Sequence, residues 1–218
     1  MAYKERHNKF TEFWMRLVIW REHHIKEKTF MLILALVIGV LCGFAAQLLK
    51  FLIHQISGFL TAHMQTTTAN WLYLVYPVVG ILIVTFFLRV VVKENISHGV
   101  TKVLYAISRR KSRLKKRNMY ASLVASSITI GCGGSVGAEG PIVFTGAAIG
   151  SNIGQAFRLS PRVLMILVGC GAAAGIAGIF RAPIAGMLFT LEVLMIDLTG
   201  TTVMPLILAS VAGAVVAY

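Results

Sequence analysis

The chain has 218 residues, of which 57% are hydrophobic and only 13% charged, with a mean hydropathy of +0.78. This composition excludes a soluble enzyme and predicts an all-α polytopic membrane protein. Its uncharged runs approach or reach the roughly 17–25 residues with which a helix crosses a bilayer. These runs are Phe30–Leu49, Trp71–Leu88, Met119–Ala138, Gly140–Phe157, Val163–Phe180 and Leu198–Tyr218.

The net charge of +13 is distributed as in a membrane protein and not as in a nucleic-acid-binding protein. Seven Lys/Arg residues lie in 1–28 and nine in Lys93–Arg117, whereas Thr61–Asn70 has none. Because cytoplasmic loops are enriched in Lys and Arg, this pattern predicts two basic cytoplasmic segments joined by an outward and a returning span. The cluster Arg109–Arg117 is interpreted as a solvated loop near anionic head groups, with a regulatory lipid site as the alternative.

The N-terminal segment, residues 1–28, is predicted to be cytoplasmic. Within it, residues 8–22 have apolar side chains at helical spacing, which indicates an amphipathic helix at the membrane interface. No cleavable signal peptide is apparent, because charged residues precede the first apolar run. Residues 29–218 are predicted to form the transmembrane part, beginning with spans over Thr29–Leu60 and Asn70–Val92.

The middle of the chain predicts shorter helices. A helix of about three turns is expected between Asn95 and Ile107, which is too short and too polar to span the bilayer. The chain then re-enters the membrane through Asn118–Thr129. Glycines at four-residue spacing, at positions 146, 150, 154, 171 and 175, predict close helix packing in lipid. Ser160 and Pro161 are expected to start the next helix, and Pro183 a short one that reaches about Ile196.

The glycine-rich stretch Gly131–Pro141 is predicted to be the functional centre. It leads into Pro141, which favours the first position of a helix, and a helix start presents N–H groups and a positive dipole end to an anion. Glu139 is a carboxylate within this apolar surround, and an ionisable residue at membrane depth indicates function. The pattern suggests a carboxylate that competes with a small anion for one site; a structural carboxylate bonded to backbone N–H groups is the alternative.

Gly137-Ala138-Glu139-Gly140-Pro141 resembles the G-[KR]-E-G-P signature of the CLC chloride channels and proton-coupled chloride antiporters. Two further stretches agree with this family, Gly146–Gly154 and Gly171–Gly178, the second leading into Arg181-Ala-Pro183. The resemblance implies the first of two inverted repeats with tilted and broken helices. It also implies Glu139 as the gating glutamate. The anion-binding residues that it implies are Gly137, Ala138, Gly140, Pro141 and Ile142.

The resemblance places a second anion-binding helix start near Gly99. The family's motif there, G-S-G-I-P, is poorly matched by Ser97-His98-Gly99-Val100-Thr101. In register, His98 takes the place of the anion-coordinating serine, and Ser97 supplies a hydroxyl only if the loop shifts by one residue. His98 is either a solvated or capping residue or an anion-facing one, whose charge would make binding depend on pH.

The resemblance also bears on proton coupling. Proton-coupled members carry an inner glutamate at the position that is Val193 here, directly after Glu192, and valine is what the plain channels carry. Glu192 is interpreted as a solvated or paired carboxylate, or as a substitute proton relay. The resemblance therefore implies a chloride channel, with a proton-coupled chloride antiporter as the alternative.

The remaining predictions concern partners and other classes of protein. No cofactor, metal site or catalytic set is evident: Val136 interrupts a dinucleotide-binding pattern, and Cys42, Cys132 and Cys170 are interpreted as buried apolar residues. The family's second repeat is not found, so we expect a partial sequence of a longer homodimeric protein of the plasma (inner) membrane. A non-transporting membrane fragment is the further alternative.

Overall fold

The computed structural model describes residues 27–61, 72–92, 99–109, 111–195 and 199–218, all helical or connecting turns. Its helices, in chain order, are α2 (Glu27–Thr61), α3 (Leu72–Phe87), the π-helix η1 (Leu88–Val92), α4 (Gly99–Arg109), α5 (Asn118–Gly131), α6 (Glu139–Ala156), α7 (Pro161–Phe180), α8 (Pro183–Val193) and α9 (Gly200–Val216). The predicted interfacial helix in residues 8–22 lies outside the described residues.

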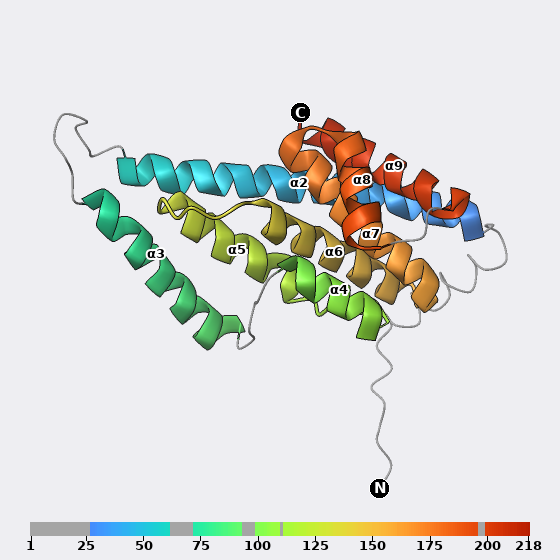
Figure 1. The fold of residues 1–218 in the computed structure, drawn as a ribbon, viewed down its shortest axis with the longest axis horizontal. Coiled ribbons are helices and arrows are strands. Elements are labelled where there is room, and N and C mark those ends of the chain that lie inside the picture. The colour runs from blue at the N-terminus through green and yellow to red at the C-terminus, as the bar shows by residue number, and fades with distance from the viewer. Residues whose placement is uncertain (1–26, 62–71, 93–98, 110, 196–198) are drawn as a thin grey trace, which may run out of the picture.

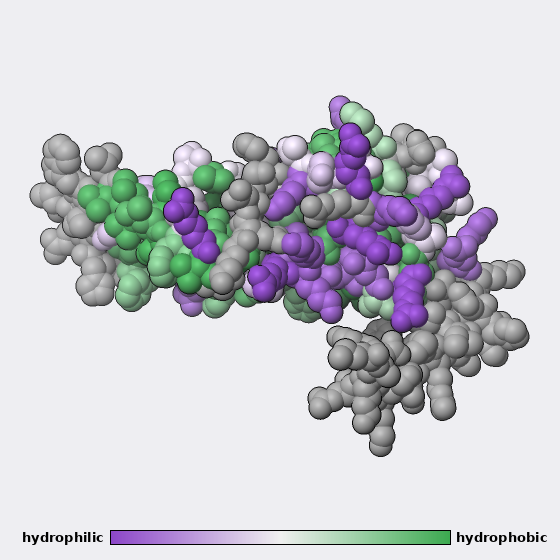
Figure 2. Space-filling model, turned by 90° about the horizontal axis from the view of Figure 1, so that it is seen from below, coloured by the Kyte–Doolittle hydropathy of each residue, from purple (hydrophilic) through white to green (hydrophobic). Residues whose placement is uncertain are grey.

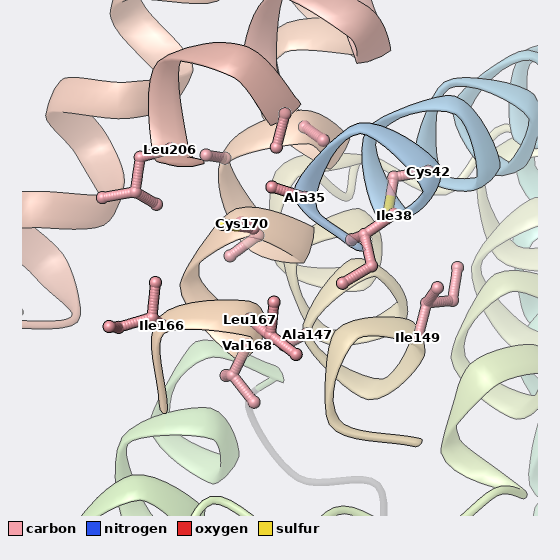
Figure 3. Close-up of a cluster of buried hydrophobic side chains, with 14 of the residues drawn as sticks. Ala35, Ile38, Cys42, Ala147, Ile149, Ile166, Leu167, Val168, Cys170 and Leu206 are labelled. Carbon is pink, nitrogen blue, oxygen red and sulfur yellow. The ribbon is translucent and has the colours of Figure 1, made fainter. Parts of the chain in front are cut away.

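The core is built mainly from α2, α6 and α7, with further buried residues from α4, α8 and α9. Figure 3 shows their side chains meeting, with Ile38 from α2, Ala147 from α6, Leu167 from α7 and Leu206 from α9, all fully buried. Figure 1 shows α2 running along most of the molecule with α9 beside it. Small side chains make up much of this core. They allow the helix backbones to approach one another closely.

The contact between α6 and α7 is made by backbone against backbone. A Cβ atom built on Gly146 would collide with the carbonyl oxygen of Gly171, and one on Gly171 would collide with that of Gly146. Gly150 faces the carbonyl of Leu167 one turn further along. The close packing predicted from the glycine spacing is therefore confirmed for this pair of helices.

Several helix ends agree with the sequence-based expectations. Ser160 caps α7 by accepting a hydrogen bond from the N–H of Val163 at 3.5 Å, and Pro161 is the first helical residue. Pro183 likewise starts α8, although this helix ends at Val193, before the expected end at about Ile196. One expectation was wrong: α6 begins at Glu139 and not at Pro141. Pro141 fits because its missing N–H and fixed φ are tolerated anywhere in the first helical turn.

Two of the described helices are long and apolar enough to cross a membrane, namely Glu27–Leu60 and Pro161–Phe180. Shorter apolar helices occupy Val75–Val90, Pro183–Val193 and Gly200–Val216. The Lys50 ammonium of α2 donates to the carbonyl of Gly178 at 3.1 Å. It thereby satisfies a carbonyl group in the last turn of α7.

Candidate functional site

The stretch between α5 and α6 returns the chain to the middle of the molecule (Figure 1). It begins with a turn in which the N–H of Gly134 donates to the carbonyl of Thr129 at 2.9 Å. Gly133 has φ of +87°, a left-handed conformation that glycine adopts without strain. The glycine-rich sequence thus ends α5 sharply and allows the chain to double back, so that α6 starts inside the bundle.

Glu139 occupies the first helical position of α6, and its side chain is exposed. Ala138 is the N-cap residue and supplies no side-chain hydrogen bond. The N–H of Ile142 donates to the carbonyl of Ala138 at 3.2 Å, and Pro141 has no N–H. The N–H groups of Glu139 and Gly140 therefore remain available at the positive end of the helix dipole.

The backbone around Glu139 is open on one side and anchored on the other. Cβ atoms built on Gly137 and Gly140 would have no neighbour within 4 Å, so the space on that side of the two glycines is open. Ile142, in contrast, is fully buried in a cluster with Ala46 and Leu49 of α2. The burial of Ile142 thus anchors the start of α6, while the side of the backbone at Gly137 and Gly140 is accessible.

The start of α4 lies against the start of α6. A Cβ atom built on Gly99, the first residue of α4, would lie 2.6 Å from the carbonyl oxygen of Gly140. The two helices pack together and run in the same direction from this point (Figure 1). Their positive dipole ends therefore point to one region, which is an arrangement that attracts an anion.

Of the residues predicted for this second helix start, only Gly99 can be placed. Ser97 and His98 lie outside the described residues, so their predicted roles stay predictions.

One charged residue near the site was not predicted. Lys102, one turn into α4, holds its ammonium 5.7 Å from the ring centre of Phe144 in α6. Its position three residues after Gly99 on a helix was the available signal.

Glu192 and Val193 belong to a different part of the molecule. They end α8, where Glu192 is exposed and Val193 partly buried. Gly186 of α8 packs against Ala173 and Ala177 of α7, whereas α6 packs against Gly171 on the opposite face of that helix. The structure therefore does not bring Glu192 together with Glu139.

Metal ligation is not supported by the part of the chain that the structure describes, which contains no cluster of three His, Cys, Asp or Glu side chains. Cys42 and Cys170 are buried and Cys132 is partly buried, and all three are unpaired. The arrangement that can act on an ion in this region consists of two helix starts and an adjacent exposed carboxylate.

Comparison with known proteins gives the family. The family model described as voltage gated chloride channel matches residues 80–218. The chain belongs to this CLC family. Its members include channels and exchange transporters, so the chain is not assigned to any enzyme class.

Individual relatives agree with this assignment. The chain is 31% identical over 150 residues to a ClcB-like chloride channel protein of Ralstonia nicotianae, covering 67% of this chain and 35% of that protein. It is 30% identical over 168 residues to the H(+)/Cl(-) exchange transporter ClcA of Klebsiella pneumoniae, covering 74% of this chain and 35% of that protein.

A solved structure supports the fold. A CLC-type fluoride/proton antiporter superposes with a TM-score of 0.71 and 28% sequence identity, over 87% of this chain and 46% of that one. The all-helical membrane fold expected from the sequence is thereby confirmed. The chain spans from about a third to about half of the length of these relatives.

Proposed function

We propose that this CLC chain contributes the gate and half of an anion site to a path that conducts chloride across a membrane. The observation that carries the proposal is the meeting of the α4 and α6 starts at Gly99 and Gly140 beside the exposed Glu139 carboxylate. Such paired helix ends stabilise an anion without a fixed cationic side chain, so that the anion can leave again.

The proposed gate is the Glu139 side chain itself. Ionised, it competes with chloride for the N–H groups at the start of α6. Protonation, or competition by a higher chloride concentration, displaces the carboxylate and opens the path. Acid therefore favours conduction. The residue before it is Ala138, where the family signature has a Lys or Arg, so that residue contributes no cation to hold the carboxylate in place.

Passive conduction is the first candidate because Val193 cannot carry a proton. Proton-coupled exchange is the second candidate. It is favoured by the similarity to the Klebsiella pneumoniae exchange transporter and to the fluoride/proton antiporter. An exchanger would need another proton carrier on the inner side, for which Glu192 and His98 are the available residues.

The experiment compares Glu139→Gln with the parent in liposomes that contain the full-length protein, recording chloride efflux and proton movement together. Glutamine mimics the protonated side chain and removes an attraction to the helix start of about 1 kcal/mol. We expect about fivefold more flux at neutral pH and a flat pH profile. Glu192→Gln removes a carboxylate that does not lie at the start of α6, and in a channel it should keep the parent's pH profile.

The outcomes separate the two candidates. A Glu139→Gln protein that stays as pH-gated as the parent would contradict the gate. Chloride flux without proton movement in the parent supports the channel. Uphill proton movement driven by chloride supports the exchanger, and loss of that movement in Glu192→Gln would identify its inner relay.

The assembly is proposed to be a homodimer in the plasma (inner) membrane, in which each subunit has its own path. The resemblance of the sequence to the CLC family is the ground for this assembly and location. Light scattering of the detergent-solubilised protein tests it, since a strictly monomeric particle would contradict the homodimer.

A further inference from the structure

A small basic cavity lies on the face of the molecule that carries α4, between this helix, the turn after it and the first residue of α5. It has a volume of about 70 Å³, and its polar lining residues are Lys102, Tyr105, Arg113, Lys115 and Asn118. No carboxylate is among its lining residues. Figure 2, which views the molecule from below, shows hydrophilic side chains gathered over the part of this face where α4 lies, while apolar side chains cover the part toward α3.

The turn that carries Arg113 and Lys115 is hydrogen-bonded to α6. The hydroxyl of Ser151 accepts from the N–H of Leu114 at 2.8 Å and donates to the carbonyl of Ser112 at 2.7 Å. Gln155 donates to the carbonyl of Leu114 at 3.1 Å and to the Ser151 hydroxyl at 2.9 Å.

Lys111 and Ser112 have φ of +50° and +61°, a conformation that is unfavourable for residues other than glycine. The hydrogen bonds from α6 offset this cost and fix the turn, so the two cationic side chains leave it from defined backbone positions.

Asn118 provides a separate sign that the cavity receives a ligand. Its side chain is 4% exposed, yet its Oδ1 atom is buried without a hydrogen-bond partner. Such an unpaired buried polar atom costs about 1–3 kcal/mol, and a ligand in the cavity that Asn118 lines would supply its missing partner. The carboxamide can accept from a ligand hydroxyl, or turn over and donate its N–H groups to an anionic oxygen.

We propose that this cavity is a binding site for a phosphate group, carried either by a phospholipid head group or by a soluble phosphate. Three cationic side chains supply charge-assisted hydrogen bonds to its oxygens, and a guanidinium binds two of them at once. The volume has room for roughly two water molecules, which suits one tetrahedral oxyanion whose remaining substituent extends into solvent or lipid.

The test uses the full-length protein in detergent and two probes. Binding of phosphatidylglycerol and of phosphatidylcholine is measured by native mass spectrometry. Thermal unfolding is measured in sodium phosphate against sodium gluconate of equal ionic strength. Selective phosphatidylglycerol binding without stabilisation by phosphate identifies a lipid site, and stabilisation by phosphate identifies a site that accepts the soluble ion.

The matched variants are Arg113→Gln with Lys115→Gln, and Lys111→Gln with Lys116→Gln. Each pair removes two positive charges from the same turn, but only the first pair lines the cavity. We expect the first pair to weaken binding by at least about tenfold and the second pair by less than about twofold. Equal losses would show general charge attraction, and binding of neither probe would also overturn the proposal.

Asn118→Leu gives an independent readout. It replaces the unpaired amide with an apolar group of similar size, so the unliganded protein should unfold at the same or a higher temperature. The stabilisation by the bound probe, in contrast, should fall. A variant that is stabilised by the probe as strongly as the parent would remove Asn118 from the site and with it this part of the proposal.

Discussion

At the scale of single residues, Gly99 sets how closely the two helix starts approach. A Cβ atom there would lie 2.6 Å from the carbonyl oxygen of Gly140 and 3.2 Å from the Cβ of Phe144. The first distance is shorter than side-chain atoms tolerate, so any larger residue must push α4 away from α6. The glycine thus serves the approach of two backbones, and the proposed anion site lies in front of them.

Gly99→Ala should therefore separate the two helix starts, weaken the anion site and lower chloride flux. We expect it to destabilise the protein by about 1–3 kcal/mol, as overpacking does. Gly200→Ala is the control, because Gly200 also begins a helix but has no atom within 4 Å of a built Cβ. Flux through liposomes and thermal unfolding check both variants; equal behaviour of the two would show that the approach at Gly99 is unimportant.

At the scale of helices, the contact between α6 and α7 rests on Gly146 and Gly171, whose positions leave no space for a side chain. Gly171→Ala should separate the two helices and cost about 2–3 kcal/mol or more. Gly58→Ala serves as control, since it has open space around it and should change stability by no more than about 0.5 kcal/mol. Unfolding in denaturant measures both; a Gly171→Ala protein as stable as the control would contradict the packing argument.

The helices could be predicted where their signals are local. Long apolar runs gave α2 and α7, and Ser160 with Pro161 gave the start of α7 within one residue. The π-helix at the end of α3 could not be predicted, because it depends on a shift of backbone hydrogen bonds by one residue. The left-handed turn at Lys111 could not be predicted from the sequence, for a different reason. Its support comes from Ser151 and Gln155, which are distant in sequence.

The candidate site was predictable only where its signals are local in sequence. The glycine-rich stretch and Glu139 predict a helix start with a carboxylate beside it. The structure places Glu139 at the start of α6, with its side chain exposed. That Gly99 of α4 would lie against Gly140 of α6 is a tertiary contact, which no local pattern encodes. Neither could the sequence reveal the unpaired oxygen of Asn118, because burial and hydrogen bonding depend on the packed structure.

At the scale of the whole molecule, the starts of α2 and α9, the end of α6 and the α4–α5 turn lie at one end. The N-terminal part of α2 contacts the chain just after α6 through Phe30 and Phe157, whose rings are 5.3 Å apart. The start of α9 lines a cavity with Lys28, also at this end of α2. At the other end of α9, Gln47 donates to the carbonyl of Val216 at 2.8 Å. The two helices therefore run in the same direction, with their starts on one side.

This arrangement predicts a cytoplasmic location for the α2 start, the α4–α5 turn and the α9 start, since Lys and Arg are retained on that side. Phe59 lies ~48 Å along α2 from its first residue and is 78% exposed. That length exceeds the hydrocarbon core of about 30 Å, so Phe59 should reach the outer surface. Single cysteines at Lys116→Cys and Phe59→Cys, in a full-length protein whose native cysteines, including Cys42, Cys132 and Cys170, are replaced by alanine, report on the two sides.

A membrane-impermeant maleimide should label Phe59→Cys in intact cells, and Lys116→Cys only after the membrane is permeabilised. Each variant is the control for the other, because both are exposed and differ only in the side of the membrane that we assign to them. Labelling of Lys116→Cys in intact cells would reverse the orientation. The Glu139 gate would then open toward the cytoplasm, and the phosphate site would face the outside, where the basic turn would have no anionic leaflet to contact.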